Sequence, residues 1–260
     1  MRGGGEMASA AARLLFLAGF PVVVLELARP LAVRRLVSYA EAVHCGEMTV
    51  EGLSARRVAD AAAAAEAARS RAFLPVLVDP AADSLPELPA GVLVDARMLK
   101  HEGGPGLGQA ALVVGVGPGF VAGSNVHAVV ETQRGPGLGR VLWEGAAAAD
   151  TALPAAVEGI TEARMLRAPR AGCFRAAAQI GDMVEVGTIV GNVSGTPVVA
   201  RAAGLLRGLL RDGVEVEAGI KLGDVDPRGR AIDPAAISDK ARAVAAGVLE
   251  AVLVGLARRR

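Results

Sequence analysis

The first residues with chemical potential are glycines at the mouth of an expected helix. Residues 3–8 fit the pattern G-x-G-x-x-A, immediately ahead of a helix-forming segment. In such a turn Gly3 and Gly5 let the backbone approach a ligand, and the free amides at the helix start attract a pyrophosphate. Glu26 ends the next expected strand, where an acid meets a ribose hydroxyl. Gly3, Gly5, Ala8 and Glu26 therefore predict a nucleotide-binding site.

Two interpretations of this turn stay open. The pattern belongs after a first strand, yet only Met1 and Arg2 precede Gly3. Either that strand is nearly absent, or residues upstream of Gly3 are missing from the sequence. The alternative to ligand binding is a glycine turn that serves only the packing of a helix against a strand.

Further polar or glycine-rich segments follow short apolar runs. Asp79 and Asp95 each end such a run, and a second glycine turn, with Gly117 and Gly119, follows another. In an open parallel sheet, ligands bind where the carboxyl ends of the strands meet. We therefore expect both glycine turns, Glu26 and both aspartates along one sheet edge. Each aspartate alone would also suit a turn or a helix cap.

The candidates for catalysis are Asp95, Lys100, His127 and Glu131. Strand alternation places His127 and Glu131 on one face, where they could handle a proton or bind a ribose, with Arg134 nearby for a phosphate. A histidine satisfied by structural hydrogen bonds is the alternative. The sequence contains no Ser-His-Asp pattern, no metal-ligand cluster and no Walker loop, so we predict no metal and favour binding over catalysis.

These residues need elements that position them. Helix-forming segments over 7–18 and 50–70 alternate with short β-branched runs. The runs lie at residues 22–26, 76–78, 92–94, 112–115, 126–130 and 141–143. Unalternated apolar runs separated by helices indicate a parallel sheet covered on both faces. We predict an α/β fold whose first part, residues 1–160, is a Rossmann-like domain.

An internal repeat marks the second part of the chain. Residues 168–193 align with residues 200–225 at a constant offset of 32, matching Arg175 with Arg207 and four glycines with four glycines. Each copy is too short to bury its own face, so two copies should form a small β-sandwich. The pattern resembles the biotinyl and lipoyl carrier fold, a barrel-sandwich hybrid, over 161–230. The joining hairpin lacks the carrier lysine, which argues against a carrier role.

Composition and the C-terminus limit the partners and the compartment. The 260 residues include 28 basic and 27 acidic side chains, a net charge of +1, which gives no basic surplus for nucleic acid. Residues 235–260 predict a docking helix with Ser238 as its N-cap, since the apolar run is shorter than the roughly 20 residues of a membrane span. The sequence has only two cysteines, too few for a disulfide framework, and it shows no signal-peptide pattern. We therefore predict a cytoplasmic protein without a membrane partner.

An ordered set of short motifs resembles the selenium-dependent molybdenum hydroxylase system protein family, a group of bacterial accessory proteins. The matching segments are residues 2–9, 18–23, 94–98, 115–120, 126–132, 134–135, 167–169, 222–228 and 237–242. The chain departs from the family where Glu6 replaces an expected aspartate and Pro136 an expected histidine. The strand before Gly3 is also cut short, which puts the affinity for a nucleotide in doubt.

The resemblance implies an accessory role in the maturation of a molybdenum hydroxylase. The implied partner is that hydroxylase, and the implied ligand is the dinucleotide form of the molybdenum cofactor, a small anionic nucleotide. One alternative is an NAD(P)-dependent oxidoreductase in which Glu26 selects the cofactor and His127 or Lys100 moves a proton. The other is a structural module that binds nothing. Whether the chain is an enzyme, and whether it forms a homo-oligomer, stays open.

Overall fold

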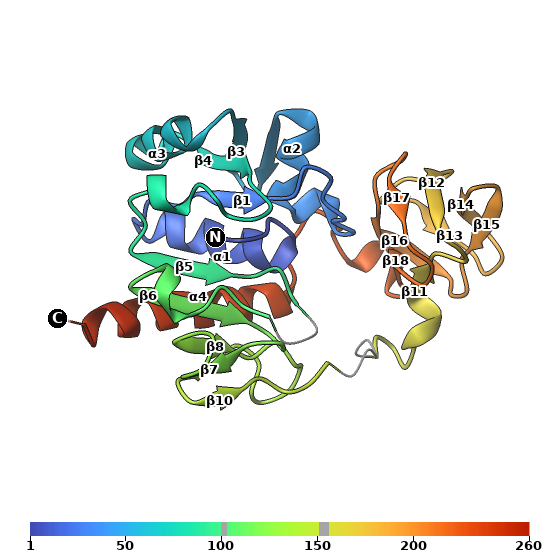
Figure 1. The fold of residues 1–260 in the computed structure, drawn as a ribbon. Helices are drawn as coiled ribbons and strands as arrows, with labels where there is room; N and C mark the ends of the chain where they lie inside the picture. The colour runs from blue at the N-terminus through green and yellow to red at the C-terminus, as the bar shows by residue number, and fades with distance from the viewer. Residues whose placement is uncertain (100–102, 151–155, 260) are drawn as a thin grey trace. The chain divides into compact units, whose positions relative to one another are not determined.

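The computed structural model describes residues 1–99, 103–150 and 156–259, and the chain divides into two compact units (Figure 1). Unit 1 contains Met1–Pro30, Ser38–Asp150 and Ile237–Arg260, and unit 2 contains Leu31–Val37 and Thr151–Ala236. Both units are therefore built from segments that are distant in the sequence. The C-terminal helix belongs to unit 1.

The described strands of unit 1 form two four-stranded sheets, in the orders β1-β4-β3-β2 and β5-β6-β8-β9, and a β7-β10 pair. Their bounds are β1 Val24–Glu26, β2 Glu47–Val50, β3 Leu53–Val58, β4 Leu74–Val78, β5 Val92–Asp95, β6 Leu112–Val116, β7 Val121–Ala122, β8 Ala128–Val130, β9 Val141–Leu142 and β10 Gly145–Ala146. β1, β4 and β3 run parallel, as do β5, β6 and β8. β2 and β9 are antiparallel edge strands, so each sheet is mixed.

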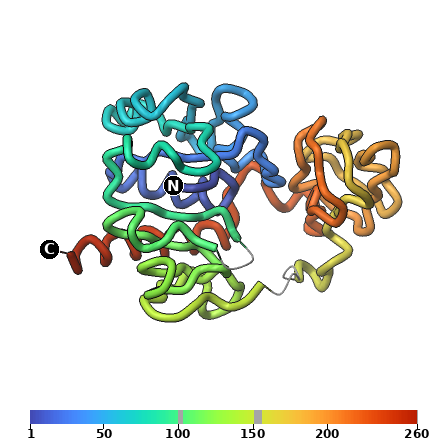
Figure 2. Tube along the Cα trace, in the orientation of Figure 1, coloured from blue at the N-terminus to red at the C-terminus, as the bar shows by residue number. Residues whose placement is uncertain are grey.

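The first residues of the chain lie between the two four-stranded sheets. Arg2 forms parallel bridges to Leu25 of β1 and to Asp95 of β5. The Leu25 amide donates to the Met1 carbonyl at 2.8 Å, and the Gly3 amide donates to the Leu25 carbonyl at 2.8 Å. The N-terminal residues therefore lie among the strands of unit 1, and Figure 2 marks the N-terminus over the middle of this unit. This short extended segment delivers the chain to the first glycine turn.

The helices of unit 1 are α1 Glu6–Leu17, α2 Ala42–Cys45, α3 Ala61–Ser70 and α4 Asp239–Ala257. α1 and α4 pack against each other, and the buried residues of the two helices include small ones such as Ala11, Ala12 and Ala251. The predicted N-cap of α4 is confirmed, because the Ser238 hydroxyl accepts from the Ala241 amide. Close helix packing holds the two helix starts side by side.

The helix predicted over residues 50–70 is wrong in its first half. Glu51 and Gly52 both adopt left-handed backbone, with φ of 43° and 82°, and form the two-residue turn of the β2–β3 hairpin. This turn conformation matches the twist of antiparallel strands. The helix begins only after Asp60, whose carboxylate accepts from the Ala63 amide at 2.8 Å. The alanine-rich segment thus yields α3 alone.

Unit 2 contains two four-stranded antiparallel sheets, in the orders β11-β18-β16-β13 and β15-β14-β12-β17. Their bounds are β11 Met165–Arg167, β12 Gly172–Ala176, β13 Met183–Val184, β14 Ile189–Val193, β15 Thr196–Val199, β16 Gly204–Leu209, β17 Glu215–Val216 and β18 Lys221–Asp226. Side chains from both sheets share one core, which includes the buried Phe174, Leu206 and Leu222.

The 32-residue repeat is confirmed by the strands. β12, β13 and β14 begin 32 residues before β16, β17 and β18 respectively. The short strand of each copy pairs in the sheet of the other copy, since β13 adds to β16 and β17 adds to β12. Each copy therefore completes the other, as expected for halves that cannot bury a face alone.

The predicted fold class needs correction. A Rossmann-like parallel sheet followed by a barrel-sandwich hybrid is not the observed architecture, whereas the C-terminal helix is present as α4. The described strands lie in five small sheets that mix parallel and antiparallel pairs, beside four α-helices, and α4 is an integral part of unit 1. The antiparallel edges arise because β2 and β9 pair by hairpin-type connections rather than helical crossovers. Within the described residues, no helix has the length and apolar composition needed to cross a membrane.

Candidate functional site

The first glycine turn is partly filled by the protein itself. The Gly4 amide donates to Glu26 Oε1 at 2.8 Å, and the Leu27 amide donates to Glu26 Oε2. Burial raises the pKa of the Glu26 carboxyl, and these two amide bonds partly offset that rise. Glu26 lies at the end of β1, as predicted, but both of its oxygens already accept hydrogen bonds inside the turn. A role on a ribose hydroxyl stays a prediction.

A neighbouring segment covers Gly4. The Ala40 amide donates to the Gly4 carbonyl at 2.9 Å, and a Cβ on Gly4 would lie 2.9 Å from the Ala40 nitrogen. The buried Ser9 hydroxyl also donates to the Gly4 carbonyl and accepts from the Tyr39 amide. Gly4 is therefore a glycine because of close packing. Gly5 differs, since a Cβ there would meet no atom within 4 Å, so the open part of the turn begins at Gly5.

The start of α4 lies beside this open part. The Ser238 amide donates to Glu6 Oε1 at 3.1 Å, which ties the N-cap of α4 to the first residue of α1. Backbone amides and the helix dipole favour an anion at each helix start. Two such starts held together give unit 1 a local preference for negative charge.

Lys240 lies in the first turn of α4 with a half-buried side chain. Within the described residues, its ammonium group makes no hydrogen bond and no ion pair. Burial lowers the pKa of Lys240, the charge of Arg134 lowers it further, and the carboxylates of Glu6, Asp150 and Glu131 act in the opposite direction. This lysine was not among the predicted site residues. Its one signal in the sequence is that lysine is rare, at three of 28 basic residues.

Asp79 and Asp95 lie at the predicted sheet edge, each bound by the protein. The Asp95 side chain is fully buried and accepts from Arg97 Nε at 2.9 Å and Nη2 at 2.5 Å, with Arg2 Nη1 4.0 Å away. Asp79 accepts from the Ser84 amide at 2.9 Å and the Ser84 hydroxyl at 2.5 Å, so it stabilises a turn. Asp95 is thus a charge-balancing anchor for two arginines.

The second glycine turn serves packing. A Cβ on Gly115 would lie 2.3 Å from Cγ of Phe120, whose ring is fully buried in a core with Leu93 and Val113. Gly117 has a φ of 84°, and a Cβ there would lie 3.0 Å from Thr132 Oγ1. The turn places Phe120 against β6, which accounts for Gly115 without a ligand. Ligand contacts of Gly117 and Gly119 stay a prediction.

The structure separates His127 from Glu131. His127 precedes β8, and its Nδ1 accepts from the Val113 amide at 2.9 Å; burial lowers its pKa, as does the charge of Arg259. Glu131 follows β8, and its carboxylate accepts from the Thr132, Gln133 and Ala148 amides at 2.6 to 2.8 Å. The two side chains lie at opposite ends of β8, so this arrangement provides no proton-transfer pair.

Arg134 and Lys100 complete the set of predicted residues. Arg134, predicted for a phosphate, makes a two-point ion pair with Asp239 at 2.7 and 2.9 Å. Lys100 lies outside the described residues. No group of three histidine, cysteine or acidic side chains within the described ranges could hold a metal ion.

An apolar cavity of about 220 Å³ lies at the other end of the unit 1 strands. Its lining is mostly aliphatic and includes Val23 before β1, Gly91 before β5, Leu15 of α1 and Ala68 of α3. The polar groups described above lie at the carboxyl ends of the strands, whereas these residues lie at the amino ends. The cavity is therefore separate from the candidate site.

Comparison with known proteins gives one extensive similarity. No family model matches the chain. The uncharacterized protein YqeB of Escherichia coli (strain K12) is 43% identical over 254 residues, which is 98% of this chain and 47% of that protein. The chain therefore spans about half the length of the curated relative it matches.

Similarities to solved structures are local. An aspartoacylase family protein from Mesorhizobium loti matches 24% of this chain and 22% of its own, at 20% identity and a TM-score of 0.23. A succinylglutamate desuccinylase/aspartoacylase from Rhodobacter sphaeroides matches 25% and 22%, at 24% identity and a TM-score of 0.22. Likenesses at this level assign neither a fold nor an activity to this chain.

These findings correct several terms that the sequence suggested. The structural neighbours are aspartoacylase and succinylglutamate desuccinylase proteins. The names of these neighbours and of YqeB mention neither selenium nor a molybdenum cofactor. The two fold terms are corrected by the strand orders of units 1 and 2, and none of the comparisons supports selenium or a molybdenum cofactor for this chain.

Proposed function

We propose that unit 1 binds a small phosphate-bearing ligand of nucleotide type where α1 and α4 begin. One observation carries the proposal: the Lys240 ammonium group is half-buried beside two helix starts, with no hydrogen bond or ion pair to any described residue. A half-buried ammonium group loses part of its hydration, and an anionic partner would compensate for that loss. A phosphate group would supply that partner.

The surrounding groups support an anion in this place. The space beside Gly5 is open, and Gly5 is the N-cap of α1 without a side-chain cap. The nearby cation Arg134 is held by Asp239, and Glu6 is held by the Ser238 amide. Among the described residues of this group, Lys240 is therefore the cation that an anion can reach without displacing an ion pair. Backbone amides would bind the phosphate oxygens, and Lys240 would balance their charge.

Titration calorimetry with ADP and with NAD(H) tests the proposal. We expect binding of at least one nucleotide, weakened roughly 10-fold or more by Lys240→Met, because a charged hydrogen bond is worth about 1.5–3 kcal/mol. Lys240→Arg should retain most of the affinity. Arg69→Met, which removes one positive charge from an exposed i,i+3 pair on α3, is the matched control and should leave binding unchanged.

A second variant tests the glycine turn. A Cβ at Gly5 meets nothing in the protein, so Gly5→Val should fold, yet its side chain would occupy the space of a pyrophosphate. Nucleotide binding that is equal in wild type, Gly5→Val and Lys240→Met would contradict the proposal. So would the absence of any nucleotide binding by the wild-type chain.

The alternative of an NAD(P)-dependent oxidoreductase predicts that the protein binds NAD(H) more tightly than ADP in the same titration. The separation of His127 from Glu131 removes one predicted proton-transfer pair, which favours binding over redox chemistry. An accessory role towards a partner enzyme stays a prediction that none of the comparisons tests.

A further inference from the structure

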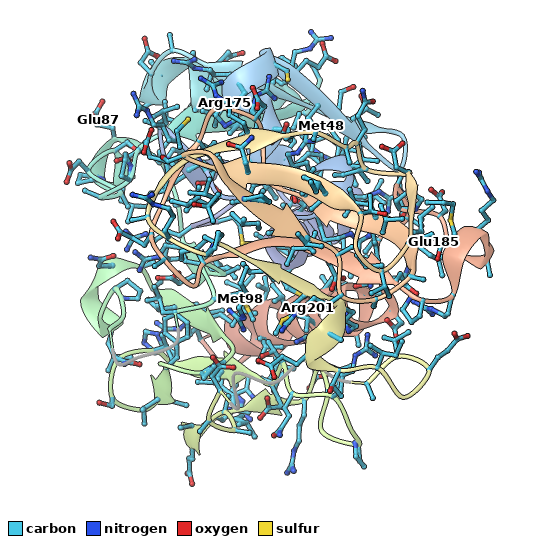
Figure 3. All side chains as sticks on the ribbon, turned by 90° about the vertical axis from the view of Figure 1, so that its right-hand side faces the viewer. Met48, Glu87, Met98, Arg175, Glu185 and Arg201 are labelled. Carbon is cyan, nitrogen blue, oxygen red and sulfur yellow. The ribbon has the colours of Figure 1, made fainter. Side chains whose placement is uncertain are left out.

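The turn of the β2–β3 hairpin contains a residue that its backbone conformation does not favour. Glu51 has a φ of 43°, in the left-handed region, and Gly52 follows with a φ of 82°. Two-residue turns of this kind favour asparagine, aspartate or glycine, because other side chains crowd left-handed backbone. Met48, labelled in Figure 3, lies on β2 of the same hairpin. A strained glutamate at this point indicates a task for its side chain.

The Glu51 side chain connects the hairpin to two helices. Its Oε1 accepts from the Ile237 amide at 3.0 Å and from Arg242 Nη2 of α4. Its Oε2 lies 3.9 Å from Arg13 Nη1 of α1, and the Glu51 carbonyl accepts from Arg13 Nε at 3.3 Å and Nη2 at 2.9 Å. Burial alone would raise the pKa of the Glu51 carboxyl, but hydrogen bonds from Ile237 and Arg242 and the charges of both arginines hold it below its ordinary value. Glu51 is therefore ionised at neutral pH.

The amide that Glu51 binds lies at the entry to α4. Ile237 directly precedes the N-cap Ser238 and is three residues ahead of Lys240. Glu51 accepts from the Ile237 amide at 3.0 Å, and Glu6 accepts from the Ser238 amide at 3.1 Å. Two consecutive amides are thus held by carboxylates, one from the hairpin and one from α1. This double attachment fixes the direction in which α4 begins and the point from which the Lys240 side chain extends.

The ion pairs of Glu51 are a weak reason for keeping a glutamate in this turn. The Arg242 side chain is 54% exposed, and ion pairs with exposed partners add little to stability. The left-handed φ of Glu51 opposes stability. A glycine at position 51 would remove the strain, but it would leave the Ile237 amide without its acceptor. The contact with the entry to α4 is therefore what distinguishes glutamate from the residues that the turn favours.

We propose that Glu51 is a positioning residue for the anion site at Lys240. It holds the entry to α4, so that the Lys240 ammonium group and the starts of α1 and α4 meet the same phosphate group. The inference rests on the proposed function, because the bound ligand is the phosphate-bearing one proposed above. In this role Glu51 itself does not contact the ligand. Loss of a negative charge favours an anion, whereas loss of positioning disfavours it, so the two effects of removing Glu51 have opposite signs.

Calorimetric titration of the full chain with ADP and NAD(H) separates these effects. Glycine suits left-handed backbone, so Glu51→Gly should fold, and it should bind nucleotide roughly 3- to 10-fold more weakly than wild type, the factor expected for one hydrogen bond. Glu51→Gln keeps an oxygen for the Ile237 amide and should bind at least as tightly as wild type, to within about twofold. Glu47→Gln is the matched control, because Glu47 is an exposed carboxylate on the same hairpin, paired with Arg56, and should leave binding unchanged.

A double-variant cycle tests whether Glu51 acts through Lys240. In the Lys240→Met background, Glu51→Gly should change the affinity by less than about twofold, because the group that it positions is gone. Equal losses in both backgrounds would mean a general structural effect and would overturn the inference. Unchanged or tighter binding by Glu51→Gly, with Lys240→Met still weakened, would overturn this inference alone. Absence of nucleotide binding by wild type would overturn the proposed function and this inference with it.

Discussion

The packing role of the second glycine turn can be tested by replacing Gly115 with alanine. The added Cβ would lie 2.3 Å from Cγ and 2.6 Å from Cβ of Phe120, distances at which something must shift. Phe120 has no exposed surface and packs against Leu93 and Val113, so its ring has little room to move. Overpacking of this kind costs about 1–3 kcal/mol, of which about 0.4–1 kcal/mol is offset because alanine restricts the unfolded chain. The difference of these terms is about 0–2.6 kcal/mol, and because the contact is as short as 2.3 Å we expect a net loss of at least about 1 kcal/mol.

Urea unfolding followed by circular dichroism measures this loss, and a melting temperature lower by roughly 2–8 °C should accompany it. Gly91→Ala is the matched control, because a Cβ on Gly91 meets nothing within 4 Å and its φ is not left-handed. It should be neutral or slightly stabilising. The double variant Gly115→Ala/Phe120→Leu should lose less unfolding free energy than the two single variants lose together, because a smaller side chain at position 120 relieves the contact. Wild-type stability of Gly115→Ala alone would refute the packing explanation.

Three further predictions concern unit 1. Ser238→Ala removes the cap that accepts from the Ala241 amide and should cost about 0.5–2 kcal/mol in urea unfolding, whereas Ser238→Asp should restore most of it. Tyr39→Phe should be neutral or stabilise by up to about 1 kcal/mol, because the buried Tyr39 hydroxyl has no hydrogen-bond partner in the described structure; a clear loss in unfolding experiments would reveal a partner. Burial would raise the pKa of Asp79, but hydrogen bonds from Ser84 and nearby amides outweigh it and hold that pKa below its ordinary value. The stability that the ionised Asp79 carboxylate provides is therefore present above the unfolded pKa of about 3.9 and is lost as the pH falls through its pKa in the folded protein. Wild type should accordingly lose more stability than Asp79→Asn between about pH 5 and pH 2.

The sequence predicts those elements whose signals are local. The apolar periodicity before Gly19 predicts α1, Ser238 predicts the start of α4, and the glycine offset of 32 predicts the paired strands of unit 2. It misplaces the helix over 50–70, because alanine-rich composition hides the turn at Glu51 and Gly52. It also misses the mixed sheets and the membership of α4 in unit 1. The place of α4 depends on contacts between segments far apart in the chain, which no local pattern records, whereas the mixed sheets arise from the hairpin-type pairing of β2 and β9.

The candidate site shows the same limit in chemical terms. A motif identifies where glycines occur, but the reason for each glycine is the atom that a Cβ would meet. At Gly4 that atom belongs to Ala40, at Gly115 it belongs to Phe120, and at Gly5 there is none. Three glycines that look alike in the sequence therefore divide into two that are required by packing and one that leaves space open. Lys240 completes this open place only because α1 and α4 pack together, so its position follows from tertiary structure and not from its neighbours in sequence.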